Sequence, residues 1–171
     1  MNDVTERPNS LPWPPIIYLA AIAVSFLLAV FYPLPWFAQP LSSILSAIGW
    51  LMIAAFVALN ISAIRAMRRA GTTVRPDRGT DHLVMEGPFS FTRNPLYLAG
   101  TTLVLGIGLV SGIVWFLLFA VLAAFAVQKL AIEREERHLQ ARFGKTYVDY
   151  AEHVRRWIYG HVWRRFASSE K

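Results

Sequence analysis

The sequence predicts an all-α protein that crosses the membrane about four times. Two long uncharged stretches support this prediction, since no Asp, Glu, Lys or Arg occurs between Pro8 and Ile64 or between Asn94 and Gln128. Stretches of that length without charge are typical of membrane spans. Hydrophobic residues make up 55% of the chain and the mean hydropathy is +0.40, which is too apolar for an ordinary soluble domain.

Proline and glycine positions divide the two uncharged stretches into four helices. A proline cluster at 33–40 ends the first helix, and a Val-Ser-Gly turn at 110–112 ends the third. Asn94-Pro95 is typical of a helix start, because Asn is a favoured N-cap and Pro loses no hydrogen bond at the first helical position. We therefore expect helices over residues 15–31, 41–65, 94–109 and 113–130.

The fourth helix is expected to continue beyond the membrane as a cytoplasmic helix to Phe143, where Gly144 stops it. At 100° per residue, Leu139 and Phe143 share an apolar face, and Glu135 and Glu136 border that face on either side. The two carboxylates should therefore lie at the edge of the packed surface. Ordinary salt bridges one helical turn apart are the alternative role for these charges.

The distribution of charge predicts the orientation of the chain in the membrane. Residues 65–93 and 129–171 carry sixteen of the seventeen Lys and Arg, whereas the turns near 33–40 and 110–112 carry none. The positive-inside rule therefore places both basic segments and both termini in the cytoplasm. We expect a single domain over 1–171, made of an N-terminal transmembrane hairpin (1–64) and a core with the second hairpin and the cytoplasmic tail (65–171).

Composition argues against metal and nucleic-acid sites. The chain has no Cys, and its four His lack the spacing of a zinc motif, so no metal site is expected. A net charge of +6 could indicate nucleic-acid binding. In so apolar a chain, anionic lipid headgroups and membrane orientation explain the basic residues better.

The junction between the first basic segment and the third helix is the best candidate for a binding site. Gly87-Pro88 is a turn signal, and the helix beginning at Asn94 presents free N–H groups and partial positive charge. Arg93 adds a full charge and a planar fork of donors. The junction is therefore suited to a carboxylate or phosphate at the membrane surface. The alternative is that Arg93 is an interfacial anchor and Asn94-Pro95 only a helix start.

Two blocks of residues resemble a known enzyme signature. The first block is Gly87-Pro88-Phe89, Arg93-Asn94-Pro95-Leu96-Tyr97-Leu98 and Gly100. The second is Glu135-Glu136, Leu139, Phe143-Gly144, Tyr147, Tyr150, Val154 and Arg156-Trp157. Together they resemble the isoprenylcysteine carboxyl methyltransferases, which are related to the phospholipid N-methyltransferases. The chain departs from the signature at Asn94, where the family usually has His.

The resemblance implies an integral-membrane enzyme that transfers a methyl group from S-adenosylmethionine (SAM) and releases S-adenosylhomocysteine. The acceptor would be a lipophilic small molecule or a lipidated substrate at the cytoplasmic face, in a bacterial inner membrane. Arg93 would orient an anionic acceptor, and Glu136 or Glu135 would be the base for an amine acceptor; Arg93 and Glu136 are the expected catalytic residues. The expected cofactor-binding residues are His82, Leu83, Val84, Gly87, Asn94, Pro95, Tyr97, Leu98, Glu135 and Glu136.

Other functions are compatible with the same residues. The same scaffold could methylate a phospholipid amine or a small thiol. Membrane sterol reductases share a partly similar C-terminal motif and would use NADPH. A non-enzymatic membrane scaffold is the third alternative. A methyltransferase should bind SAM, a reductase should bind NADPH, and a scaffold should bind neither.

Overall fold

All regular elements in the described part of the chain are helical, which confirms the predicted fold class. The computed structural model describes residues 13–71 and 83–158. The α-helices are α1 (Trp13–Phe31), α2 (Leu41–Arg69), α3 (Pro95–Ser111), α4 (Trp115–Val127), α5 (Glu133–Phe143) and α6 (Lys145–His153). A 3₁₀ turn, η1 (Gly87–Ser90), precedes α3, and a π-helical turn, η2 (Gln128–Ile132), joins α4 to α5.

The helices have the length and composition of membrane spans. Three are long and apolar enough to cross a membrane, namely α1, α2 and the continuous helix Trp115–Phe143, and α3 is a shorter apolar helix. The predicted continuation of the fourth helix to Phe143 is therefore confirmed, with a π turn at its middle that the sequence did not indicate. The chain is a polytopic integral-membrane protein.

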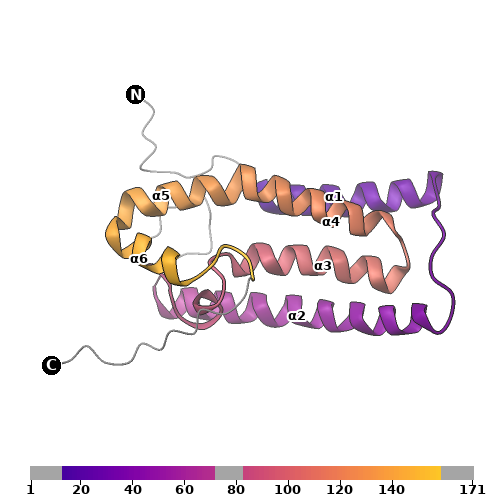
Figure 1. Cartoon of the computed structure of the whole chain (residues 1–171), viewed down its shortest axis with the longest axis horizontal. Coiled ribbons are helices and arrows are strands. Elements are labelled where there is room, and N and C mark those ends of the chain that lie inside the picture. The colour runs from indigo at the N-terminus through magenta and orange to yellow at the C-terminus, as the bar shows by residue number, and fades with distance from the viewer. Residues whose placement is uncertain (1–12, 72–82, 159–171) are drawn as a thin grey trace.

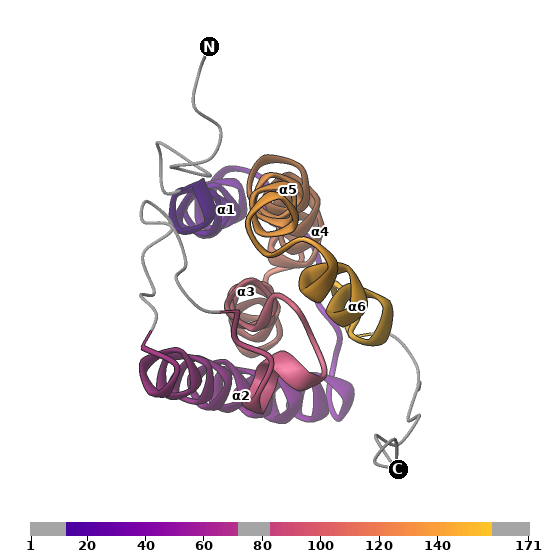
Figure 2. The same cartoon turned by 90° about the vertical axis from the view of Figure 1, so that its left-hand side faces the viewer.

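The helices form a bundle in which α3 is central. Figure 1 shows the four apolar helices lying side by side, with the α1–α2 and α3–α4 connections at the same end. Viewed from the other end, α3 lies between α2 on one side and α1 and α4 on the other (Figure 2). The main packing pairs are α2 with α3, α1 with α4, and α3 with α4.

Small residues allow α2 and α3 to approach closely. A Cβ atom added to Gly49 of α2 would lie 2.8 Å from the carbonyl oxygen of Gly106 of α3. In return, a Cβ atom on Gly106 would lie 3.0 Å from the carbonyl oxygen of Gly49. The two glycines therefore allow the backbones of α2 and α3 to approach closely, as small residues do between membrane helices.

A hydrogen-bond link fixes the start of α3 against α1. The Tyr18 hydroxyl donates to the carbonyl of Tyr97 over 2.7 Å, and it lies 3.0 Å from the Thr101 hydroxyl. Tyr97 is in the first turn of α3, directly after the Arg-Asn-Pro sequence. The apolar bundle therefore sets the position of the polar residues that precede α3.

Candidate active site

The polar residues of both sequence blocks meet at the end of the bundle where α3 begins, opposite the two short connections (Figure 1). They surround a cavity of about 60 Å³. Its walls come from α2, η1, the start of α3, α5 and α6. The lining residues are Met67, Val84, Phe89, Arg93, Asn94, Glu135, Glu136, Leu139, Tyr147 and Tyr150.

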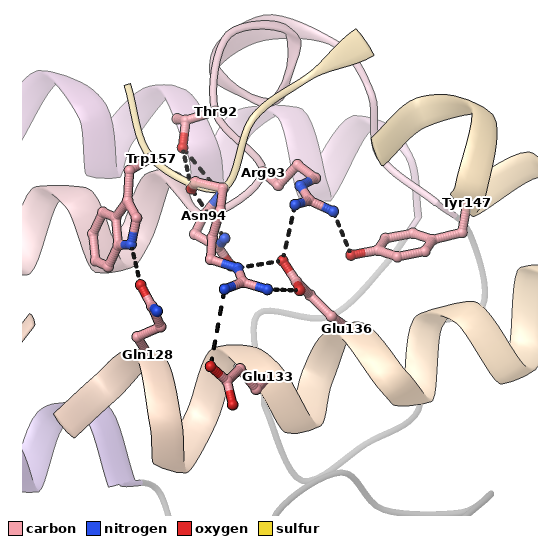
Figure 3. A network of polar contacts seen from close by, with 9 residues as sticks. Thr92, Arg93, Asn94, Gln128, Glu133, Glu136, Tyr147 and Trp157 are labelled. Carbon is pink, nitrogen blue, oxygen red and sulfur yellow. Dashed lines mark hydrogen bonds and ion pairs between the residues drawn. The ribbon is translucent and has the colours of Figure 1, made fainter. Parts of the chain in front are cut away.

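Glu136 is held between two arginines. Its Oε1 lies 3.3 Å from Nη2 of Arg93. Arg156 makes a two-point contact, donating from Nε to Oε1 over 3.0 Å and from Nη2 to Oε2 over 2.5 Å. Figure 3 shows this carboxylate at the centre of the polar network. Charge-assisted contacts of this kind are among the stronger hydrogen bonds in proteins.

Arg93 lines the cavity and has one side-chain donor without a partner among the described residues. Its Nη1 donates to the Tyr147 hydroxyl over 3.4 Å, and its guanidinium carbon lies 6.0 Å from the centre of that ring. Its Nε is buried and has no hydrogen-bond partner among the described residues. Because a buried unpaired donor is costly, this atom indicates a place where an acceptor on a ligand would be favourable.

The segment after α6 is tied to the residues that precede α3. The Arg93 amide donates to the Arg155 carbonyl over 2.9 Å. The Thr92 hydroxyl and the Asn94 side-chain amide both donate to the Arg156 carbonyl over 3.1 Å. The Trp157 indole donates to the Gln128 side chain over 2.8 Å, which anchors the same segment on the π turn.

These contacts correct the predicted role of Asn94 as a side-chain cap. α3 does begin directly after Asn94, with Pro95 as its first residue, but no side-chain cap hydrogen bond forms there. The Asn94 side chain instead binds the Arg156 carbonyl, because the C-terminal segment brings that carbonyl to the helix start. The Asn94 amide N–H donates to the Thr92 hydroxyl over 3.2 Å.

Glu135 occupies a different environment from Glu136. Its Oε2 accepts a hydrogen bond from the Tyr97 hydroxyl over 2.8 Å. No arginine contacts it in the described part of the chain, although it lines the same cavity. Both carboxylates border the packed face of the helix as the sequence predicted, while Arg134 and Arg137, which flank the pair in the sequence, are exposed.

Two buried tyrosines close the α6 side of the cavity. Tyr147 and Tyr150 form an edge-to-face pair with ring centres 6.3 Å apart, and the Tyr150 hydroxyl donates to the Phe89 carbonyl over 2.6 Å. Burial, followed by the Glu136 charge, raises the pKa of Tyr147 to about 12. Burial also raises the pKa of Tyr150. Both phenols are therefore neutral hydrogen-bonding groups at physiological pH and not bases.

The structure brings together only part of the set of residues predicted for cofactor binding. Val84, Asn94, Glu135 and Glu136 line the cavity with Arg93. Two others, Leu83 and Gly87, line a neighbouring groove instead. The side chains of Pro95, Tyr97 and Leu98 lie in the first turn of α3 and line neither space. His82 lies outside the described residues.

Sequence reasoning gave no site role to Arg156, Tyr147 or Trp157. All three belong to the second sequence block, so the motif contained them. Arg156 contacts Glu136, Tyr147 contacts Arg93, and Trp157 anchors the segment that carries Arg156. The signal that could have identified Arg156 was its position in the motif beside an aromatic residue.

The residues at the cavity fit a zwitterionic ligand with a carboxylate and an ammonium group. Arg93 lines the cavity and supplies a cation, while Glu135 supplies an acceptor that no guanidinium of the described residues contacts. The cavity of about 60 Å³ has room for only a few waters. Sites for drug-sized ligands occupy roughly 300–1,000 Å³, so a ligand of SAM's size requires this end of the bundle to open.

The fold and the polar site together define an integral-membrane protein with an enzyme-like cavity at one end of a helical bundle. A profile of the phospholipid methyltransferase family matches residues 44–146, which is more than half of the chain. The chain therefore belongs to the phospholipid methyltransferase family. This is a family of SAM-dependent membrane methyltransferases. No curated protein and no solved structure matches the chain significantly.

The family match covers α2 from residue 44 through α5, including Arg93, Glu135 and Glu136. Arg156 and Trp157 lie beyond the matched residues. The contact between Glu136 and Arg156 thus joins the matched region to the segment that follows it.

Proposed function

We propose that this chain transfers a methyl group from SAM to a lipophilic acceptor at the cytoplasmic face of the membrane. The observation that carries the proposal is the convergence of Arg93 and Arg156 on Glu136 beside a cavity. Arg93 comes from the first sequence block and Arg156 from the second, so the two blocks form one polar site. Family membership supports the methyl-transfer class.

The side chains at the cavity would hold the cofactor by charge complementarity. Arg93 is suited to its α-carboxylate, because the guanidinium has an unpaired buried Nε. Glu135 is suited to its ammonium group or ribose hydroxyls, because no arginine occupies that carboxylate. When bound, the cofactor supplies an electrophilic methyl group on a sulfonium. Glu136 acts as a positioning residue, since both of its oxygens already accept from guanidinium groups.

Our leading acceptor is a carboxylate of the isoprenylcysteine type. Arg93 lines the cavity and presents a planar fork of donors, which suits an anionic acceptor. A carboxylate is already nucleophilic, and it needs no base. Its reaction would therefore depend mainly on positioning beside the methyl group.

A phospholipid amine is the second candidate acceptor, favoured by the family match. An amine must lose a proton before or during transfer. Glu135 is the side chain placed for this, because it lines the cavity and no arginine occupies it. At saturating SAM, where weaker cofactor binding is compensated, turnover with an amine acceptor should depend on Glu135 and turnover with a carboxylate acceptor should not. The reductase and scaffold alternatives gain no support from the family match.

Turnover measured with isotopically labelled SAM tests the proposal and separates the acceptors. Purified protein would be given an N-acetylated S-prenylcysteine or phosphatidylethanolamine, each at saturating SAM. Transfer to the prenylcysteine that persists in Glu135→Gln and is lost in Arg93→Ala supports the carboxylate acceptor. Transfer to phosphatidylethanolamine that is lost in Glu135→Gln supports the amine. Folded protein that transfers to neither, nor to a lipophilic thiol, contradicts the proposal.

A further inference from the structure

A second, larger groove lies beside the candidate active site at the end of α2. It has a volume of about 490 Å³. One wall is the last part of α2, including Arg65 and Arg69, and the other is the segment leading into η1, including Met85 and Glu86. Leu83, Val84 and Gly87, which were expected to bind the cofactor, also line this groove, but the charges of its α2 wall have no role in the proposed methyl transfer.

Two arginines give the groove its charge. Arg65 and Arg69 are four residues apart on α2, so their side chains lie on the same helix face. Both are exposed and both line the groove, together with the single acidic residue Glu86. Arg68 is exposed on the same helical turn but does not line the groove. Among the described residues that line the groove, two are therefore basic and one is acidic.

The position of Arg65 and Arg69 along α2 places the groove at the membrane surface. The uncharged stretch of the chain ends at Ile64, so Arg65 is the first charge after the apolar part of α2. The apolar residues from Leu41 to Ile64 span about 36 Å at 1.5 Å per residue, enough to cross a hydrocarbon core of about 30 Å. Arg65 and Arg69 therefore lie at the level of lipid headgroups.

We propose that this groove binds the phosphate of an anionic phospholipid headgroup. Guanidinium groups bind phosphate oxygens with matching geometry, and a pair of them provides several donors. The apolar wall formed by Leu83, Val84 and Met85 can contact the glycerol and upper acyl region of the same lipid. A free phosphate would not use that wall, which is why a lipid is the occupant we assign.

The groove and the candidate active site share a wall. Val84 lines both spaces and is buried between them. A headgroup in the groove would therefore lie next to the catalytic cavity without occupying it. The inference is independent of the proposed methyl transfer, because lipid binding here needs neither the cofactor nor Glu136.

Lipid retention measured by native mass spectrometry tests this site on the full-length, detergent-purified protein. The probes are dioctanoyl phosphatidylglycerol, dioctanoyl phosphatidylcholine and inorganic phosphate. The variants are Arg65→Gln and Arg69→Gln, singly and together. Arg68→Gln is the control for each single variant, because it removes one positive charge from the same helical turn outside the groove. Thermal unfolding of each variant checks that these exposed substitutions leave the fold intact.

The expected result is saturable binding of phosphatidylglycerol that weakens by about tenfold or more in the double variant. Arg68→Gln should bind like the unaltered protein, and phosphatidylcholine should bind more weakly than phosphatidylglycerol. Equal binding by the double variant would overturn the site. An equal loss in Arg68→Gln would show general surface attraction and overturn it too. Inorganic phosphate binding as tightly as the lipid would overturn the assignment to a lipid.

Discussion

Glu136 and Arg156 form a two-point contact, with Nε and Nη2 of the guanidinium donating to the two carboxylate oxygens over 3.0 and 2.5 Å. The hydrogen bond to Glu136 raises the pKa of Arg156, so the pair stays charged. This pair ties the segment after α6 to α5 and sets the place of Arg93 beside it. Glu136 therefore links the two arginines of the site.

Glu136→Gln should lower both turnover and stability. The substitution removes the charge that two guanidinium groups share, and we expect a loss of about 1–3 kcal/mol in the free energy of unfolding. Glu133→Gln is the matched control on the same helix, because Glu133 is paired mainly with the exposed Lys129. Thermal unfolding in detergent and turnover with labelled SAM measure the two effects. Equal effects in the two variants would contradict a special role for Glu136.

A double-mutant cycle on Glu136 and Arg156 should show strong coupling. We expect a coupling free energy of about 1–3 kcal/mol, because the contact has two points and Glu136 is largely buried. The Lys129–Glu133 pair lies one helical turn apart and is more exposed, so its coupling should be much weaker. Denaturant unfolding of the single and double variants gives both values. Coupling at Glu136 no larger than that of the control pair would contradict the observed geometry.

The positions of the helices could be predicted from the sequence, because uncharged runs and the Asn94-Pro95 helix start are local features. The two motifs could also be assigned to one site. The contact between Glu136 and Arg156 could not be predicted, because the two residues are 20 positions apart and a turn and a second helix lie between them. The contact of the Asn94 side chain could not be predicted either, because its partner is also distant in the sequence. Its local preference is to cap α3, but a carbonyl from the distant tail provides a different partner.

The π turn at Gln128–Ile132 could not be predicted from the sequence pattern either. Its sequence is apolar on one side and fits an α-helix equally well. In the structure the turn presents Gln128 to Trp157. Because π turns insert one residue, they often re-aim side chains at functional sites.

Gly106→Ala should destabilise the bundle. The added Cβ would lie 3.0 Å from the Gly49 carbonyl oxygen, so α2 and α3 would have to separate. We expect a loss of about 1–3 kcal/mol, which is typical of overpacking at a tight contact. Ala47→Val, on an exposed position of α2, is the control and should change stability little. Unfolding temperatures that match for both variants would contradict the close approach.

Stability should fall at alkaline pH in part through Tyr147. Its pKa in the folded protein is raised from 10.0 to about 12, so the folded state favours the neutral phenol. The resulting stabilisation is fully present below about pH 10 and is lost as the pH rises toward 12. Tyr147→Phe should therefore lose less stability between these two pH values than the unaltered protein. Identical pH dependence in both would contradict the burial of this phenol.

Binding of SAM to the detergent-purified protein, measured by calorimetry, tests the central claim most directly. Arg93→Ala is the test variant and Arg68→Gln the control, with NADPH as the comparison ligand. The account predicts that SAM binds, that binding is lost in Arg93→Ala and kept in Arg68→Gln, and that NADPH does not bind. Folded protein that binds NADPH in place of SAM, or binds SAM equally well without Arg93, would contradict it.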